Sequence, residues 1–224
     1  MKKLLFLLLT SSIAFFSCQS KEEKAAELIK SELSKTLYDF ESYQPMETTV
    51  KEAKASIYND STCWAIGGAL AYSTKQVLEY IDEMTDAKEH MDIWGRPTYY
   101  SSSYSDNKYY KYKEEYTEAK NKTIKGLLIC KNVISALKDS IAKIDTTQVI
   151  GWEVIHRFRC KSKGGYASIG EYRYIIDKDF EKVLLCEDKD GEIDKKRREA
   201  LEAINADFWE NIDKTIKSLS QSEI

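Results

Sequence analysis

The sequence predicts an α+β protein. An antiparallel sheet, made of a three-stranded meander and one earlier strand, would pack with N- and C-terminal helices and carry a long inserted antiparallel helical hairpin. Over most of 60–144, apolar residues recur every three or four positions, which is typical of amphipathic helices. From 148 to 186 they alternate with period two between short turns, which is typical of antiparallel strands. With 224 residues, the chain can bury a core without crosslinks.

The first helix is expected from Glu22 to about Tyr38, where helix-forming residues dominate and the apolar ones follow helical spacing. A strand is expected after it, over Met46–Ala55. Pro45 disfavours helical backbone in the residue before it, and β-branched residues follow at 48–50. This helix and strand would form the base of the domain together with the later meander.

Two long helices are expected next, over about 60–91 and 106–144. Each carries one apolar stripe that needs a partner, so the two should fold back on each other. Gly67 and Gly68 either weaken the first helix, by about 1 kcal/mol each, or let another element approach closely. Cys63 and Cys130 lie on the two stripes at similar distances from the turn, so a disulfide between them is possible. The alternative is that both are small buried side chains.

The meander is expected to comprise strands near 152–160, 166–176 and 183–186. On the first strand, one face carries mainly charged residues, and the other carries Trp152, Val154, His156, Phe158 and Cys160. Cys160 and Cys186 would stand on strands separated by the middle one, about 10 Å apart and too far to bond. A final helix from Glu192 to about Leu219 would close the domain.

The chain begins like a secretory signal, with two lysines followed by the apolar run Leu4–Phe16. This run is shorter than the roughly 20 residues that a membrane-spanning helix needs. Phe15 is too bulky for an ordinary signal-peptidase site before Cys18. A different processing route is therefore expected for this leader.

Phe15-Phe16-Ser17-Cys18 resembles the lipobox of bacterial lipoproteins, with Phe15 in place of the usual aliphatic residue, which implies that the Cys18 thiol is lipidated. Lys21, Glu22 and Glu23 resemble the export signal of Bacteroidota-type surface lipoproteins; the alternative is the charged first turn of a helix. The stretches "DFESYQP" and "HRFRCKSKGGYASIGEYRYIIDKDFEKV" are similar to a domain of uncharacterised Bacteroidota-type lipoproteins. The resemblance implies an anchored α+β module with no activity attached.

The expected organisation starts with a signal peptide over residues 1–17 and a lipidated N-terminus with a short tether over 18–24. A single α+β domain would cover 25–219, with the helical hairpin at about 60–144, and a tail would cover 220–224. The mature chain would be anchored in the outer membrane through its acyl chains, because several long chains hold a protein on a bilayer. Its expected location is the cell surface, with the periplasmic face as the alternative.

The loop between the two long helices is rich in tyrosine, which suits stacking on sugars or docking on a protein surface. Tyr99, Tyr100 and Tyr104 form a possible contact loop; alternatively, they pack back over the turn. Three further tyrosines, Tyr109, Tyr112 and Tyr116, are expected to cover the partner helix.

Other site chemistry is not favoured by the sequence. His156 and Cys160 would stand about 13 Å apart on one strand, too far to share a metal ion. The segment at 186–197 fails as a calcium loop, since Cys186 and Arg197 occupy positions that need carboxylates. No nucleophile–base pair is evident, so no enzyme and no cofactor are expected. The mildly acidic chain, of net charge −3, suggests no nucleic-acid partner. A protein interaction or scaffold role is expected, with small-ligand or glycan binding as the alternative and a hydrolase as a third class.

Overall fold

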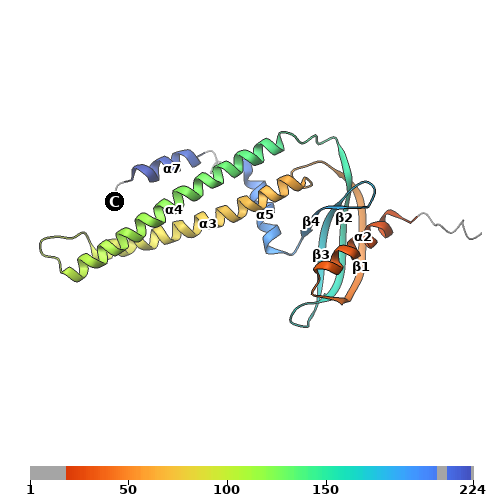
Figure 1. Cartoon of the computed structure of the whole chain (residues 1–224), viewed down its shortest axis with the longest axis horizontal. Coiled ribbons are helices and arrows are strands. Elements are labelled where there is room, and N and C mark those ends of the chain that lie inside the picture. Colours follow the sequence, from red (N-terminus) through yellow and green to blue (C-terminus); the bar gives the residue numbers. More distant parts are fainter. Residues whose placement is uncertain (1–18, 206–210, 223–224) are drawn as a thin grey trace, which may run out of the picture. The chain divides into compact units, whose positions relative to one another are not determined.

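The structure is a computed structural model that describes residues 19–205 and 211–222. Its elements are shown in Figure 1, and the expected α+β class is confirmed. The described residues divide into two compact units instead of the single domain expected over 25–219. Unit 1 contains α2 and the strands β1, β2, β3 and β4, and unit 2 contains α3, α4, α5, η1 and α7.

Helix α2 spans Lys21–Thr36 and begins at a capping box. The Ser20 hydroxyl accepts from the Glu23 amide, and the Glu23 carboxylate accepts from the Ser20 amide, so two amides at the start of the helix are paired. Leu37 has extended backbone and ends the helix. The tether expected over 18–24 is therefore shorter than predicted, because helical backbone already starts at Lys21.

Four antiparallel strands form the sheet of unit 1 in the order β1-β2-β3-β4. They are β1 (Asp39–Lys54), β2 (Val149–Lys161), β3 (Ala167–Ile176) and β4 (Val183–Asp188). Strand β1 is longer than the expected 46–55 and includes Pro45. A proline is tolerated there because β1 is an edge strand and its register with β2 shifts between Pro45 and Glu47.

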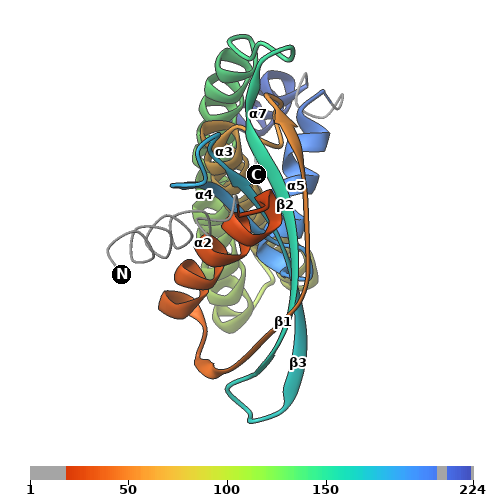
Figure 2. The ribbon, with the colours of Figure 1, turned by 90° about the vertical axis from the view of Figure 1, so that its right-hand side faces the viewer.

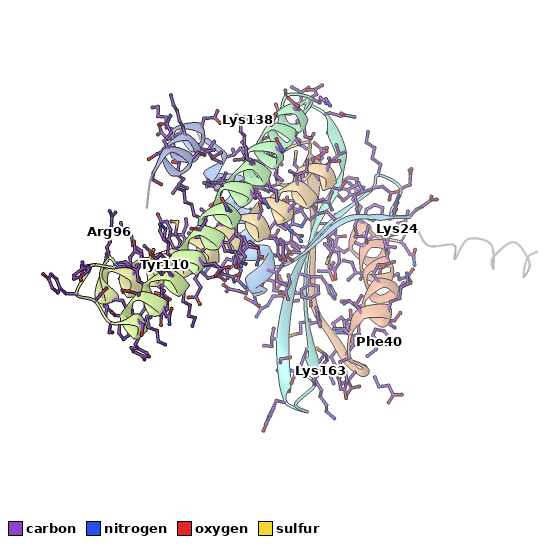
Figure 3. The ribbon with its side chains drawn as sticks, turned by 60° about the vertical axis from the view of Figure 1, so that its left-hand side comes forward. Lys24, Phe40, Arg96, Tyr110, Lys138 and Lys163 are labelled. Carbon is purple, nitrogen blue, oxygen red and sulfur yellow. The ribbon has the colours of Figure 1, made fainter. Side chains whose placement is uncertain are left out.

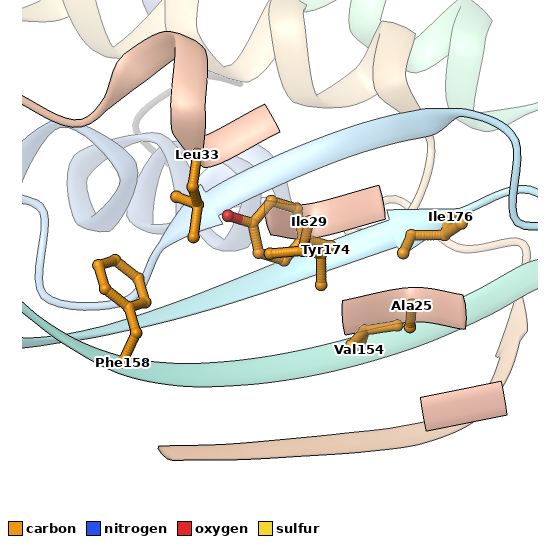
Figure 4. Packing of buried hydrophobic residues seen from close by; sticks show 7 residues of the cluster. All are labelled: Ala25, Ile29, Leu33, Val154, Phe158, Tyr174 and Ile176. Carbon is orange, nitrogen blue, oxygen red and sulfur yellow. The ribbon is translucent and has the colours of Figure 1, made fainter. Parts of the chain in front are cut away.

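One face of this sheet packs against α2, as Figure 2 and the close view in Figure 4 show. Val154 pairs with Tyr174 and Trp152 with Ile176, so the period-two pattern of both strands points to the same face. The buried cluster consists of Ala25, Ile29, Leu33, Val154, Phe158, Tyr174 and Ile176. Burying side chains of this size stabilises the fold by about 1.5–3 kcal/mol for each large one.

The opposite face of the same sheet carries an ion pair between neighbouring strands. Arg173 on β3 is in register with Glu187 on β4, and the Arg173 Nε donates to the Glu187 carboxylate. Both side chains are buried. Removing one partner of such a pair leaves an uncompensated buried charge, so the pair fixes the β3–β4 register.

Unit 2 is built on the expected helical hairpin. Helix α3 spans Ser61–Trp94 and helix α4 spans Ser103–Ile141. The Asp60 carboxylate caps α3 by accepting from the Cys63 amide over 2.7 Å, and Ser102 caps α4. Their facing stripes are buried, among them Leu70, Val77, Leu127 and Leu137. Gly126 lets the helices approach closely, because a Cβ there would lie 2.7 Å from Val77 Cγ2.

The possible Cys63–Cys130 disulfide is not formed, and both cysteines are buried free thiols, which was the alternative considered for them. Cys130 lies opposite Ser73, whose hydroxyl accepts from the Cys130 thiol over 3.4 Å. Cys63 is ten residues earlier on α3, which places it about 15 Å along the helix from that level. The prediction aligned the helices from ends at Met91 and Asp106, whereas both helices are longer and the packing of their stripes sets a different register.

The prediction of a single C-terminal helix over 192–219 was wrong. Helix α5 spans Glu192–Glu202, continues as the short 3-10 helix η1 (Ala203–Asn205), and is separate from α7 (Ile212–Gln221). Helix α5 packs on α3, and α7 packs on α4. One straight helix would pack along a single neighbour. With α5 and α7 separate, Leu201 is buried against α3 and Ile212 is buried on the helix that packs on α4.

Gly67 and Gly68 allow another element, helix α5, to approach α3 closely, which was one of the two roles considered for them. A Cβ at Gly67 would lie 2.8 Å from Leu201 Cγ, and one at Gly68 would lie 2.8 Å from Arg197 Nε. The Arg197 guanidinium also stands 5.1 Å from the Trp64 ring centre. Helix α5 therefore packs directly against the backbone of α3 at Gly67 and Gly68.

Candidate functional site

The predicted lipid-attachment residue, Cys18, lies outside the described residues. The proposed export residues Lys21, Glu22 and Glu23 form the first turn of α2. Glu23 closes the capping box, and the Lys21 ammonium stands 3.7 Å from the centre of the Trp152 ring on β2. Two of the three residues thus make defined contacts within unit 1, and the Glu22 side chain is exposed.

The tyrosine loop lies at the end of the hairpin, next to Arg96 in Figure 3. Tyr99 and Tyr100 are 95% and 93% exposed, and their rings meet edge to face with centres 5.3 Å apart. Tyr104 packs edge to face on Trp94, with ring centres 5.5 Å apart. Of the three tyrosines in the predicted contact loop, Tyr99 and Tyr100 are therefore almost fully exposed, whereas Tyr104 packs on Trp94 at the turn.

A cavity of about 300 Å³ lies beside this loop, within unit 2. Tyr109 and Met91 are buried on its wall, which otherwise includes the charged residues Lys88, Asp92 and Arg96. Aromatic surface next to charged hydrogen-bonding groups is the chemistry that binds sugars and small polar molecules. Sequence reasoning missed this cavity, because Lys88 lies near the end of α3, Arg96 follows that helix, and Tyr109 lies near the start of α4.

An apolar groove of about 410 Å³ runs between α3 and α4. Its floor includes Ser73 and Gly126, which are buried, and the exposed residues Ala69, Tyr72 and Ile129 line its rims. Other wall residues are Gln76, Tyr80, Lys122, Lys125 and Val133. The sequence contained a signal for this groove that the prediction did not use. The series 69, 72, 76, 80 and 122, 125, 129, 133 each follow helical spacing, beside the stripes that form the core.

His156 lies on β2, directly opposite Thr48 of β1. Its ring is completely buried, with Nε2 2.8 Å from the Tyr43 hydroxyl and Nδ1 2.9 Å from the Thr48 hydroxyl. Burial lowers the pKa of His156 to about 4, because the charged imidazolium would lose its hydration. Burial also raises the pKa of Tyr43. The imidazole is therefore neutral and inaccessible, which makes it a packing group between β1 and β2.

The described residues hold no group of three or more His, Cys, Asp or Glu side chains placed to bind a metal ion. His90, the other histidine, stacks on Tyr112 with ring centres 4.5 Å apart. Cys160 and Cys186 lie on different strands of unit 1 and form no disulfide.

Comparison with protein-family models, curated protein sequences and solved structures found no match to this chain. Over residues 19–205 and 211–222, no helix is both long enough and apolar enough to span a membrane.

Proposed function

We propose that the chain is an outer-membrane lipoprotein, anchored through Cys18 and exposed at the cell surface, that acts as a non-enzymatic interaction or scaffold module. The anchor is supported by the lipobox-like sequence before Cys18 and by the short distance between Cys18 and the first helix. Lys21, Glu22 and Glu23 support surface export. The helical hairpin of unit 2 is the interaction element.

The observation that carries the interaction role is the apolar groove between α3 and α4. Exposed apolar side chains that line one continuous groove mark interaction sites more often than scattered ones do. The groove would take a partner helix, whose apolar stripe would contact Tyr72 and Ile129 on the rims. Lys125 on the same wall favours a partner helix with a carboxylate beside that stripe, whereas Lys122 is already paired with Glu118 and Glu83.

The anchor is tested by expressing the full chain in a bacterial host with lipoprotein-processing enzymes. We expect mass spectrometry to find diacylglycerol on Cys18 as the first residue, and the protein to sediment with membranes. A Cys18→Ser variant should carry no diacylglycerol, whereas a Cys186→Ser variant, which changes an exposed cysteine, should still carry it on Cys18. Diacylglycerol on the Cys18→Ser variant, or a mature N-terminus at another residue, would contradict the proposal.

Surface location has its own test. Protease added to intact cells should degrade the protein, whereas a variant with Lys21, Glu22 and Glu23 all changed to alanine should be protected. Equal protection of both proteins would place the lipoprotein on the periplasmic face.

The interaction role is tested by placing a photo-crosslinking amino acid at Ile129 on the groove rim, in cells of the native host. The matched control is Ile193, an exposed apolar residue on α5 outside the groove. We expect a discrete crosslinked species from position 129, absent from position 193 and lost when Tyr72→Asp is added. Identical crosslinks from both positions would exclude the groove as the binding site.

The cavity beside the tyrosine loop favours a second candidate, binding of a glycan or small polar ligand. Tyr99 and Tyr100 would stack on sugar rings while Lys88 and Arg96 contact polar groups. If this is the main function, the full chain binds an arrayed glycan, and changing Tyr99 and Tyr100 to alanine abolishes that binding. If the groove is the main site, the same double change leaves the Ile129 crosslink intact.

A further inference from the structure

The groove between α3 and α4 does not end where its apolar part ends. A second cavity, of about 370 Å³, follows it along the hairpin toward the tyrosine loop, and Lys122 lines both. The Lys122 ammonium stands 5.9 Å from the centre of the Tyr80 ring in the apolar part and 3.6 Å from the Glu83 carboxylate in the second cavity. The two cavities are therefore halves of one surface, which we call the long groove.

Both helices keep one register along the long groove. The Cys130 thiol contacts Ser73 in the apolar half, and Tyr112 stacks on His90 at the far end of the other half. Seventeen residues of α3, from Ser73 to His90, thus lie beside eighteen residues of α4. On α3 the lining follows alternating steps of three and four residues, at positions 73, 76, 80, 83, 87 and 90. This is the spacing that keeps a helix face in contact with another helix over many turns.

The other helices of unit 2 leave the long groove uncovered. Helix α5 packs on Gly67 and Gly68 of α3. Helix α7 reaches α4 through the Lys131–Asp213 ion pair and through Lys120, which donates to a carbonyl oxygen at the end of α7. None of these residues lines the long groove. In the described part of unit 2 it is therefore an open face of two helices, and from position 69 to 90 it is about 32 Å long.

The half nearer the tyrosine loop is acidic. Four exposed carboxylates and one ammonium group are on its wall: Glu83, Asp86, Glu115, Glu118 and Lys122. Lys122 pairs with Glu83 and Glu118, and Lys111 pairs with Glu115. Asp86 has no basic partner among the described residues. Since the carboxylates outnumber the ammonium groups, this half keeps a negative charge that a partner can complement.

We propose that the long groove binds one amphipathic helix of a partner protein, about six turns long, with one half apolar and the other half rich in lysine or arginine. The apolar half lies over Tyr72 and Ile129, and the basic half lies over Asp86 and Glu115. The change of chemistry along the groove fixes which end of the partner helix lies toward the tyrosine loop. This inference rests on the proposed interaction role of the groove and adds the chemistry, length and placement of the partner.

The test places a photo-crosslinking amino acid at Ile129 in one full-length chain and at Asp86 in another, both in cells of the native host. Ile129 is next to Cys130, which contacts Ser73, and Asp86 lies 13 residues beyond Ser73 on α3. We expect mass spectrometry to find both crosslinks in one segment of the same partner, about 13 residues apart. The segment captured at position 129 should be apolar, and the segment captured at position 86 should carry lysine or arginine. Capture at position 86 of another protein, of an acidic segment or of a second copy of this chain would overturn the inference.

A pair of charge reversals tests the acidic half directly. Asp86→Lys combined with Glu115→Lys should lower the crosslink yield at Ile129 by about ten-fold, because two attractive contacts at the rim become repulsive. The matched control is Asp82→Lys with Glu114→Lys, which makes the same charge change at exposed residues of the same helices outside the long groove. An unchanged yield in the first variant, or an equal loss in both, would overturn the inference.

The crosslink at position 129 separates this inference from the proposed function. If no discrete species forms there, the interaction role of the groove and the basic partner helix both fail. If a partner is captured at position 129 but no basic segment of it is captured at position 86, the interaction role stands and the inference alone fails.

Discussion

At the scale of single residues, His156 makes the stability of unit 1 depend on pH. Its pKa is about 4 in the folded protein, against 6.5 for an ordinary histidine. Between these values the unfolded chain binds a proton that the folded chain excludes, so the free energy of unfolding falls as the pH is lowered. The loss should reach about 3 kcal/mol at pH 4 and be absent above about pH 7.

This prediction can be measured by NMR titration of the two histidines and by hydrogen exchange of β2 amides between pH 7 and pH 4. A His156→Gln variant should lose about 3 kcal/mol less than the native chain over that interval. A His90→Gln variant retains His156 and should keep the full loss. A native His156 that titrates near 6.5 would contradict the buried neutral ring.

The four described cysteines should differ sharply in reactivity. Burial, with the nearby Asp60 carboxylate as a second cause, raises the pKa of Cys63 to about 11, and Cys130 is buried beside Ser73. The thiolate is the reactive form, so neither should be alkylated in the native protein at pH 8. Cys186 is exposed and should react first.

Peptide mass spectrometry after a short iodoacetamide pulse measures this order. The same protein in urea, where all four thiols should react, is the control. A non-reducing digest that contains a Cys63–Cys130 crosslink would show that the register of α3 and α4 described above is wrong.

At the scale of elements, two adjacent glycines should respond differently to the same substitution. Alanine favours helix by about 1 kcal/mol relative to glycine. At Gly67 the new methyl group would collide with Leu201 in the core, and such overpacking costs about 1–3 kcal/mol. At Gly68 it would meet the flexible side chain of Arg197, which can shift. We expect Gly67→Ala to destabilise unit 2 and Gly68→Ala to leave it unchanged or slightly more stable.

Urea unfolding followed by far-ultraviolet circular dichroism compares the two variants. Adding Leu201→Ala to Gly67→Ala should cost less than the sum of the two single changes, because the smaller side chain removes the collision. Additive losses would mean that α5 does not pack on Gly67.

The helices and strands were largely predictable because their patterns are local. The apolar spacing of α3 and α4 and the alternation of β2 identify each element without knowledge of its partner. Register is not local. The level of Cys130 relative to α3 depends on how Gly126 fits Val77, and the separation of α5 from α7 depends on two different partner helices. The groove was missed for the same reason, since only the pairing of α3 with α4 brings Tyr72 and Ile129 to one surface.

At the scale of the whole molecule, each unit has its own core, so a substitution that destabilises one unit should leave the stability of the other largely unchanged. Leu33 is buried in unit 1 and Leu137 in unit 2. Replacing either leucine by alanine should cost about 2–5 kcal/mol, through lost burial and the cavity left behind. We expect each change to accelerate hydrogen exchange in its own unit by about 30-fold or more and to affect the other unit much less.

Hydrogen exchange with mass spectrometry, read separately for peptides of β2 and of α4, provides the measurement. The two variants serve as each other's control, because they make the same chemical change in different units. Faster exchange throughout the chain in both variants would mean that the units unfold as one cooperative body.

The junction of β1 and β2 has a consequence for how this architecture can vary. Lys54 pairs with Val149, and the Ala55 amide donates to the Gln148 carbonyl oxygen over 2.9 Å, so the intervening segment leaves and re-enters the sheet side by side. Any insert whose two ends meet at that spacing would satisfy the same strand pairing. The helical hairpin can therefore change in length by whole turns while β1 and β2 keep the same pairing.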